Sequence, residues 1–473
     1  MVKRYPVLKE DIYFAKIHTD SGLQVRIRNT TTEKDFKPTP DTVALLTLCT
    51  GTNTVDEIIA ILSEQSGEPA DTLVEDVTAI VKVLQEKGIL TIATSPLKRS
   101  ILPAKEIKGK YLTESAQIEI TNRCNLSCVH CVNNSGEPCP DELTTQEILS
   151  LIDTLSSMGV QRIIFTGGEP LLHPDLFQIL KHARKAPMIV DIFTNGTLLT
   201  EENVKKFKKL GIRQFAVSID CINESIHDAF RGQKGALRRT LHGIKLLKEA
   251  EFPVRISISI AQLNKNNIID TIMYLEEHDL KPYQMAEVNF SGRGLEGVAV
   301  SPEEYYQVMV EQLTYRKEFS NEIKAPVLKP EGGCGIAQSE ICIKSDGTIL
   351  PCHACLRDMG VGNVRDVDLA EFWDKNETLE MFRSMRAEND TACRDCRYLA
   401  FCEGCIANAF TLEKKIRSYD PYACARQKAY DTVFAAEEIE EEYSEDIIFR
   451  NEDNKTSLFG GEGGGSGSGG APG

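Results

Sequence analysis

The spacing of hydrophobic and polar residues predicts a repeated element order over residues 113–315. Short runs rich in β-branched and aromatic residues alternate there with longer stretches whose apolar residues recur at helical spacing. Strands that are separated each time by a helix pair in parallel. The strand candidates are Gln117–Ile120, Ile163–Phe165, Ile189–Phe193, Phe215–Ile219, Val254–Ile260 and Tyr283–Phe290. We therefore expect an α/β fold, a partial (β/α)6 barrel with its chemistry at the carboxyl ends of the strands.

A smaller module precedes this region, over residues 1–95. Two stretches of strand-like pattern, Asp11–His18 and Gly22–Arg28, are followed by three of helical pattern. The helical stretches are Asp41–Cys49, Val55–Gln65 and Ala70–Lys87. This order predicts a small α+β domain with a winged-helix-like pattern. Residues 96–112 contain two prolines, several basic residues and no sustained period, which is typical of a linker.

The carboxyl-terminal part of the chain has a different character. Residues 330–430 are dense in cysteine and poor in long periodic elements, so we expect metal clusters rather than a large apolar core to hold them together. Residues 431–473 are first acidic and then rich in glycine and serine. That composition is typical of a flexible tail outside the fold.

Composition narrows the classes of protein to consider. The sequence of 473 residues has no run of about 18 apolar residues and no apolar signal segment at its start, so we expect a cytoplasmic protein without a membrane partner. In a reducing compartment its 15 cysteines favour metal or cluster ligation over disulfides. The formal net charge of −16 argues against a nucleic-acid partner.

Three of these cysteines follow the first strand candidate directly. Cys124, Cys128 and Cys131 have C-x3-C-x2-C spacing, and three thiolates can hold three irons of a [4Fe–4S] cubane. The fourth iron would then keep an open position for a small molecule, as catalytic metal sites do. A zinc knuckle or incidental buried thiols are the alternatives. The next strand candidate, which leads into the segment Thr166–Pro170, counts against both.

That segment has the composition of a ligand-binding turn. Gly167 and Gly168 allow the backbone to approach a ligand closely, and Glu169 offers an anionic acceptor for a cationic amine. Further candidates lie after later strands, and each also has an ordinary explanation. Asn195-Gly196 is a common turn pair, Ser218 suits the edge of a core, and Arg231 suits a surface salt bridge.

Taken together, residues 113–315 resemble the radical S-adenosylmethionine (SAM) superfamily. The resemblance implies that the amino and carboxylate groups of SAM chelate the open iron of the cluster held by Cys124, Cys128 and Cys131. It also implies which residues bind SAM. The stretch Gly167, Gly168, Glu169 and Pro170 would contact the amino group, and Asn195, Ser218 and Arg231 would lie near SAM, with Arg231 as partner of the carboxylate.

A second field of cysteines lies in residues 330–430. Twelve residues separate Cys334 from Gly347, and four separate Gly347 from Cys352. Farther on, Cys393, Cys396, Cys402 and Cys405 form a C-x2-C-x5-C-x2-C run, and Cys424 follows. A zinc ribbon would place about 15–20 residues between its two C-x2-C pairs, so two interleaved clusters fit better.

This field resembles the SPASM extension of peptide-modifying radical SAM enzymes, with x2 where that family often has x3. The resemblance implies two auxiliary [4Fe–4S] clusters: one on Cys334, Cys352 and Cys405, the other on Cys393, Cys396, Cys402 and Cys424. The first lacks an evident fourth ligand. Either Cys342 or Cys355 completes it, or the site is open to the substrate. The remaining cysteines, Cys49, Cys139 and Cys221, lack a ligand-spaced partner and are expected to be ordinary thiols.

The module at 1–95 resembles the peptide-recognition domain of ribosomal-peptide pathways. The residues that carry the resemblance are PDTVALLTLCTGTNTVDEIIAIL and VTAIVKVLQEKGIL, and the module is similar to the small chaperone of pyrroloquinoline quinone biosynthesis. A free sheet edge could bind a leader peptide as an added strand. A nucleic-acid-binding winged helix is the alternative, but this segment has little net charge.

The whole architecture resembles sactipeptide and related thioether-forming maturases. It implies thioether crosslinks made from the cysteines of a precursor peptide by a 5′-deoxyadenosyl radical, with SAM, three [4Fe–4S] clusters and a flavodoxin- or ferredoxin-type electron donor. Carbon–carbon crosslinking, epimerisation and maturation of a protein active site are alternatives. An electron-transfer or metal-scaffold protein is another. Thr166–Pro170 and Thr194–Gly196 count against it, because electron transfer needs no SAM pocket.

Overall fold

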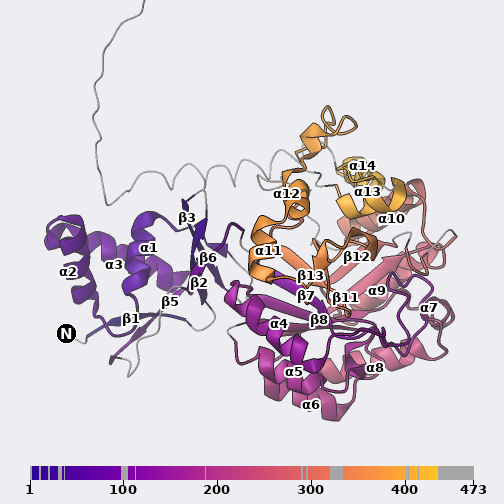
Figure 1. The fold of residues 1–473 in the computed structure, drawn as a ribbon, viewed down its shortest axis with the longest axis horizontal. Coiled ribbons are helices and arrows are strands. Elements are labelled where there is room, and N and C mark those ends of the chain that lie inside the picture. The colour runs from indigo at the N-terminus through magenta and orange to yellow at the C-terminus, as the bar shows by residue number, and fades with distance from the viewer. Residues whose placement is uncertain are drawn as a thin grey trace, which may run out of the picture. The chain divides into compact units, whose positions relative to one another are not determined.

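The computed structural model describes residues 3–434 except 10–11, 20–21, 30–34, 37, 97–104, 112, 187, 289–290, 295–296, 320–333, 401, 403 and 414. From residue 435 on, the tail expected over 431–473 lies outside the described residues. The chain divides into two compact units, and the division falls between Lys108 and Gly109 (Figure 1).

The first unit contains two small sheets and three helices. Strands β1 (Tyr5–Leu8) and β5 (Leu90–Ala93) pair antiparallel. A second sheet has the order β4-β3-β2-β6. Its strands are β2 (Ile12–Thr19), β3 (Gly22–Asn29), β4 (Asp35–Phe36) and β6 (Lys105–Lys108), and the helices are α1 (Pro40–Leu48), α2 (Val55–Ser66) and α3 (Ala70–Glu86). The predicted α+β class is confirmed. The segment expected as a linker, 96–112, contains β6, which pairs with β2 in parallel.

In both units, residues at the first turn of a helix determine where that helix begins. The Thr54 side chain accepts a hydrogen bond from the Glu57 N–H while the Glu57 carboxylate accepts one from the Thr54 N–H, and this capping box begins α2. Thr144 and Glu147 begin α4 (Thr145–Ser157) in the same way. Gly67, with φ of +78°, ends α2 in the left-handed conformation that favours glycine.

The second unit is built on one sheet of nine strands. The order is β12-β11-β10-β9-β8-β7-β13-β14-β15, and β7 to β12 are parallel to their neighbours. The six parallel strands are β7 (Ser115–Glu119), β8 (Arg162–Thr166), β9 (Ile189–Thr194), β10 (Gln214–Ser218), β11 (Val254–Ile260) and β12 (Tyr283–Glu287). Each predicted strand overlaps one of them, so the predicted α/β class is confirmed. The last candidate extended to Phe290, and residues 289–290 lie outside the described part.

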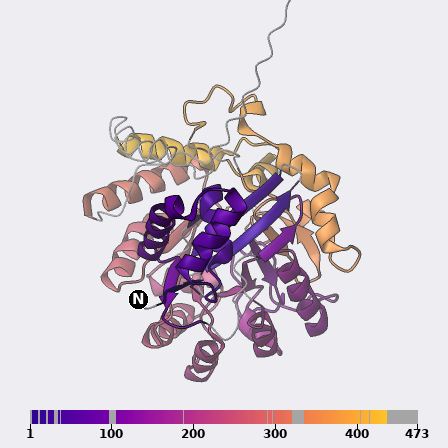
Figure 2. The same ribbon diagram turned by 90° about the vertical axis from the view of Figure 1, so that its left-hand side faces the viewer.

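Helices cover this sheet on both sides. The helices between the strands are α4, α5 (Leu176–Ala183), α6 (Glu201–Leu210), α7 (Glu224–Arg231), α8 (Ala236–Glu249) and α9 (Ile268–Glu277). Figure 1 shows α4, α5, α6 and α8 on one side and the orange and yellow helices of the carboxyl-terminal segment on the other. Figure 2 shows the same division, with the magenta helices opposite the orange and yellow ones.

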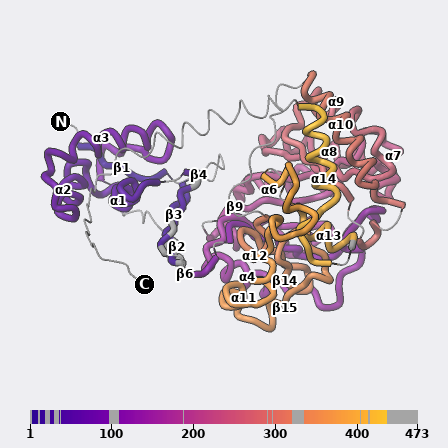
Figure 3. The backbone as a smooth tube through the Cα atoms, turned by 90° about the horizontal axis from the view of Figure 1, so that it is seen from above, coloured from indigo at the N-terminus to yellow at the C-terminus, as the bar shows by residue number. Residues whose placement is uncertain are grey.

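The cysteine-rich segment joins the same sheet. Strand β13 (Glu340–Ile343) pairs in parallel with β7, and β14 (Thr348–Leu350) and β15 (Gly362–Asn363) follow antiparallel. The helices of the segment are α11 (Leu369–Lys375), α12 (Glu377–Ser384), α13 (Ile406–Glu413) and α14 (Pro421–Val433). Helix α14 lies beside α10 (Pro302–Phe319), as Figures 1 and 3 show.

The expectation that clusters replace an apolar core in this segment is wrong. Ile341, Ile343, Trp373, Leu379 and Phe382 are buried in the same hydrophobic core as the barrel strands. The pairing of β13 with β7 makes this possible, because it continues the apolar face of the barrel sheet into the cysteine-rich segment. In the described part of the chain, no helix is long and apolar enough to cross a membrane.

Candidate functional site

A cavity of about 390 Å³ lies at the carboxyl ends of the barrel strands. At or next to its end, each of the six parallel strands contributes a lining residue. These residues are Glu119, Thr166, Thr194, Ser218, Ser259 and Glu287. Side chains from six separate strands therefore face one space, which is the arrangement that barrel enzymes use for catalysis.

The three cysteines that follow β7 line this cavity. Cys128 is buried, and Cys124 and Cys131 are half-buried. Burial raises the pKa of the Cys124 thiol to about 11, so binding of a metal cluster would have to release its proton. Three thiols on one loop beside an open cavity fit the donor set of a [4Fe–4S] cluster with one accessible iron.

The glycines after β8 pack against residues 120–136, the loop that carries these three cysteines and is called the cysteine loop below. The Gly168 N–H donates to the Thr121 carbonyl over 2.8 Å, and the Glu169 N–H donates to the Arg123 carbonyl over 2.7 Å. A Cβ at Gly168 would lie 2.4 Å from the Arg123 oxygen, and one at Gly167 would lie 2.3 Å from the Thr121 oxygen. Both glycines also line the cavity, but the close approach that they permit is to the cysteine loop.

Glu169 itself is completely buried. Its carboxylate accepts hydrogen bonds from the Asn195 N–H (2.8 Å), the Thr194 hydroxyl (2.7 Å) and the Leu171 N–H (3.1 Å). Burial raises its pKa to about 7. Glu169 and the buried Pro170 are not among the residues that line the cavity, and contact between them and an amine stays a prediction. In the structure, Glu169 holds the end of β9.

Asn195 and Ser218 both line the cavity. The Asn195 amide donates to the Asn125 side-chain oxygen over 3.0 Å, and its own oxygen accepts from the Thr197 hydroxyl over 2.6 Å. Because Asn125 follows Cys124 directly, this network ties the end of β9 to the cysteine loop. Ser218 is the last residue of β10.

Arg231 is buried at the end of α7 and also lines the cavity. Its guanidinium forms an ion pair with Asp220 at 2.6 Å, and Nη1 lies 3.7 Å from the Cys128 sulfur. The surface salt bridge that we considered from the sequence is therefore wrong, since both partners are buried. A role for Arg231 as partner of the SAM carboxylate stays a prediction.

Arg293 is a site residue that the sequence did not indicate. Its Nε donates to the Cys128 carbonyl over 2.8 Å, its Nη1 donates to the Ser135 carbonyl over 3.0 Å, and its backbone N–H donates to the Cys131 carbonyl over 2.9 Å. Gly292, at φ of +59°, makes the approach possible, because a Cβ there would lie 2.2 Å from the Cys131 oxygen. The only signal in the sequence is a glycine-flanked arginine after the last barrel strand.

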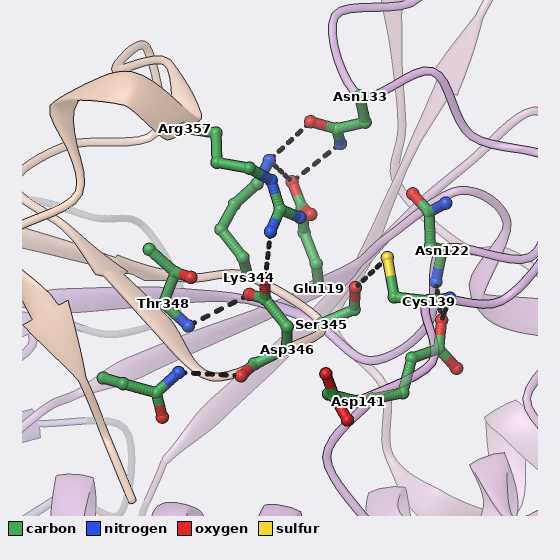
Figure 4. A network of polar contacts seen from close by, with 12 residues as sticks. Glu119, Asn122, Asn133, Cys139, Asp141, Lys344, Ser345, Asp346, Thr348 and Arg357 are labelled. Carbon is green, nitrogen blue, oxygen red and sulfur yellow. Dashed lines mark hydrogen bonds and ion pairs between the residues drawn. The ribbon is translucent and has the colours of Figure 1, made fainter. Parts of the chain in front are cut away.

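A buried polar network forms another part of the cavity wall (Figure 4). The Lys344 ammonium lies 2.6 Å from the Glu119 carboxylate and 2.5 Å from the Asn133 side-chain oxygen. The Asn133 amide in turn donates to Glu119 over 2.9 Å. Asn133 belongs to the cysteine loop and Lys344 follows β13, so the network joins the loop to the carboxyl-terminal segment.

The thiols expected at the first auxiliary cluster lie close together. Burial raises the pKa of Cys405 to about 12, and the nearby thiols of Cys352 and Cys334 act in the same direction. The His353 ring nitrogen lies 3.7 Å from the Cys352 sulfur and 2.8 Å from the Glu340 carboxylate. These three side chains could also hold a single metal ion, which would compete with the cluster for Cys352.

The thiols expected at the second auxiliary cluster form a separate group. Burial raises the pKa of Cys424 to about 11, and Cys402, Cys393 and Cys396 act in the same direction. The cysteines expected to be ordinary thiols lie elsewhere. Cys49 is in the core of the first unit, Cys221 is buried, and the Cys139 sulfur is 3.8 Å from the Ser345 hydroxyl.

Three family models match the chain. Residues 118–276 match the radical SAM superfamily, residues 334–397 match the iron–sulfur cluster-binding domain SPASM, and residues 36–90 match the coenzyme PQQ synthesis protein D (PqqD).

Two characterised relatives differ in how much of the chain they match. The AdoMet-dependent heme synthase of Methanosarcina barkeri is 33% identical over 337 residues, which cover 65% of this chain and 95% of the relative. The antilisterial bacteriocin subtilosin biosynthesis protein AlbA of Bacillus subtilis is 23% identical over 423 residues, which cover 87% of this chain and 94% of the relative.

Solved structures show the same fold. Streptococcus suis SuiB bound to S-adenosylmethionine superposes with a TM-score of 0.62 at 17% identity, over 88% of this chain and 99% of SuiB. A structure of anSMEcpe with bound AdoMet and a peptide gives a TM-score of 0.57 at 18% identity, over 71% of this chain and 99% of the other.

The chain belongs to the radical SAM superfamily. Within that family it combines a PqqD-like amino-terminal domain, a radical SAM barrel and a carboxyl-terminal SPASM domain. The family and the fold predicted from the sequence are therefore confirmed, and radical SAM and SPASM domains imply SAM and iron–sulfur clusters as cofactors.

Proposed function

We propose that this enzyme modifies a ribosomally made precursor peptide and forms thioether crosslinks from the peptide's cysteines. The PqqD-like domain binds the leader of the peptide. A flavodoxin- or ferredoxin-type protein delivers the electrons, and the reaction takes place in the cytoplasm. The observation that carries the proposal is the match of residues 36–90 to PqqD in the same chain as a radical SAM barrel and a SPASM domain.

The extent of the match to AlbA supports a peptide substrate. AlbA, a subtilosin biosynthesis protein, aligns with 87% of this chain, whereas the heme synthase aligns with 65%. The structure of SuiB bound to the precursor peptide SuiA has the same fold, at a TM-score of 0.61. An architecture shared over most of the chain favours a shared class of substrate.

We assign SAM and one [4Fe–4S] cluster to Cys124, Cys128 and Cys131, with Gly167, Gly168, Asn195, Ser218 and Arg231 around them. When bound, these groups supply a carbon radical that can remove hydrogen from an unactivated carbon, and auxiliary clusters supply an acceptor for the remaining electron. The protein's part is to orient SAM and the cluster and to enclose them in the cavity. Gly168 and Arg293 hold the cysteine loop in place.

One cavity extends between the two sets of cysteines. Cys131 of the barrel loop and Cys355 of the SPASM segment both line it. A peptide carbon and a peptide sulfur held in this space would therefore lie between the radical source and the first auxiliary cluster. This arrangement suits a reaction that removes a hydrogen atom at one site and an electron at the other.

Heme synthesis is the second candidate, since three relatives with at least 30% identity are AdoMet-dependent heme synthases. The charges around the cavity favour a peptide instead. Among the described lining residues, Lys344 is paired with Glu119 and Arg293 with backbone carbonyls. An acidic porphyrin would have to compete with these partners for its carboxylates.

Anaerobic turnover followed by mass spectrometry tests the proposal. The enzyme, SAM and a reductant are incubated with the peptide encoded beside its gene, and in parallel with an iron coproporphyrin. Loss of two hydrogens per event, with cysteines that no longer react with iodoacetamide, supports thioether formation. Loss of two hydrogens with alkylatable cysteines would indicate carbon–carbon crosslinking, and unchanged mass with solvent deuterium would indicate epimerisation. Conversion of the porphyrin alone would overturn the proposal.

A further inference from the structure

The fourth ligand of the first auxiliary cluster has not been assigned so far. A [4Fe–4S] cubane takes four protein ligands when it is closed, and only Cys334, Cys352 and Cys405 are assigned. Two more thiols of the same segment, Cys342 and Cys355, are buried close by. If either of them is the fourth ligand the site is closed, and if neither is, one iron is open to the substrate.

Cys355 is placed as a ligand would be. It follows Cys352 with C-x2-C spacing, and its N–H donates to the Cys352 carbonyl over 3.1 Å, so both thiols belong to one tight turn. Cys355 is only 4% exposed, yet it lines the cavity at the carboxyl ends of the barrel strands. Burial raises the pKa of Cys355 above its usual range, and the charges of the Cys352, Cys405, Cys342 and Cys334 thiols act in the same direction.

Cys342 occupies a different environment. It lies in the middle of β13, in register with Gln117 of β7 on one side and with Leu350 of β14 on the other. Its pKa is raised first by burial and then by Glu119. Cys342 is not among the residues that line the cavity. Pairing on both sides holds the Cys342 backbone within the strand, whereas Cys355 lies in a turn that carries its thiol to the cavity wall.

We propose that Cys355 is the fourth ligand of the first auxiliary cluster and that the iron it binds faces the substrate cavity. The assignment deepens the proposed function and rests on it only for the presence of this cluster. The cluster is then closed. A cluster held by these four thiols would offer no vacant position to a substrate thiol, and Cys355 would place one of its sulfur ligands at the wall of the cavity.

The test uses the full chain with Cys124, Cys128 and Cys131 replaced by alanine, so that only auxiliary clusters contribute to the spectra. To this parent either Cys355→Ala or, as the matched control, Cys342→Ala is added. Each anaerobic preparation is assayed for iron and sulfide, and its electron paramagnetic resonance spectrum is recorded with and without added cyanide as a probe of an open iron.

We expect cyanide to leave the parent and the Cys342→Ala protein unchanged, with about eight irons on the basis of two four-iron clusters. The Cys355→Ala protein should either bind cyanide, with a shifted signal, or lose an iron and give an oxidised three-iron signal. The signal of the second cluster reports that the segment is folded, and Cys355→Ser replaces the alanine variant if that signal is lost.

Two results would overturn the assignment. The first is a cyanide-dependent shift in the parent, because the cluster would then already be open. The second is a Cys355 variant that matches the parent, in particular if Cys342→Ala changes the spectrum instead. Peptide turnover plays no part in these measurements, so failure of the thioether proposal would leave the spectra and their interpretation unaffected.

Discussion

Lys344 and Glu119 form a buried ion pair that links the SPASM segment to the barrel. The ammonium and the carboxylate are 2.6 Å apart, and both side chains are less than a tenth exposed. Lys344 follows β13, and Glu119 ends β7, the strand that leads into the cysteine loop. The pair therefore lies where the parallel pairing of β7 and β13 ends, next to the cysteine loop.

Replacing Lys344 with methionine should destabilise the second unit strongly. The change leaves the Glu119 carboxylate buried without its cation, which typically costs about 3–5 kcal/mol. Chemical denaturation followed by circular dichroism measures the loss. The exposed pair Lys375–Glu371 is the matched control, and Lys375→Met should cost no more than about 1 kcal/mol. If the Lys344→Met and Glu119→Leu double variant is less stable than Lys344→Met alone, the explanation by an unpaired charge is wrong.

Gly168→Ala should disrupt the SAM cluster, while Gly136, a glycine of the cysteine loop, should tolerate the same change. A Cβ at Gly168 would meet the Arg123 oxygen at 2.4 Å, whereas one at Gly136 meets nothing within 4 Å. Backbone atoms cannot move aside cheaply, so the cysteine loop has to shift. The iron content after anaerobic reconstitution should fall by about four atoms for Gly168→Ala, the content of one cluster, and stay constant for Gly136→Ala. Full iron content in both variants would refute this role for Gly168.

Arg293→Met should weaken retention of the same cluster. It removes two side-chain hydrogen bonds to carbonyls of the cysteine loop, each worth about 1.5–3 kcal/mol because the donor is charged. We expect iron at Cys124, Cys128 and Cys131 to be lost to a chelator at least tenfold faster than in the unchanged protein. Arg293→Lys keeps the charge without the planar fork, so its rate of iron loss should lie between the rates of the unchanged protein and of Arg293→Met. Equal rates for all three proteins would show that Arg293 has no part in holding the loop.

The local pattern predicted the regular elements well. The stretch Val55–Gln65 corresponds to α2 (Val55–Ser66), and the candidate Ile163–Phe165 lies inside β8 (Arg162–Thr166). Capping residues and periodicity are short-range signals, so a single sequence contains them. The pairing of β13 with β7 is different, because the two strands are more than 200 residues apart and nothing local specifies their neighbourhood. That pairing is why the apolar core of the SPASM segment was missed.

The site was most predictable where spacing carried the chemistry. Cys124, Cys128 and Cys131 have ligand spacing on one loop, and the structure places all three at the cavity. Arg293 has no such spacing, and it reaches the loop only through the tertiary fold. Glu169 was expected at the ligand, yet its carboxylate is directed to the end of β9. Residue type alone does not show whether a charged side chain such as Glu169 contacts a ligand or holds a neighbouring part of the protein.

Deletion of residues 1–108 should separate peptide recognition from radical chemistry. This cut removes the first unit together with β6, which pairs with β2 and would lose its partner in a shorter deletion. SAM cleavage without peptide should persist within about twofold, while peptide modification at low peptide concentration should fall at least tenfold, or about 1.4 kcal/mol of lost binding. Measuring 5′-deoxyadenosine and modified peptide in the same reaction gives both values. Undiminished peptide modification would reject leader binding by this domain.

The most direct test of the account is SAM cleavage by a chain in which Cys124, Cys128 and Cys131 are all replaced by alanine. We expect formation of 5′-deoxyadenosine under reduction to be abolished, while about eight irons remain on the basis of two auxiliary four-iron clusters. Cleavage at the rate of the unchanged enzyme would contradict the assignment of the radical site to this loop.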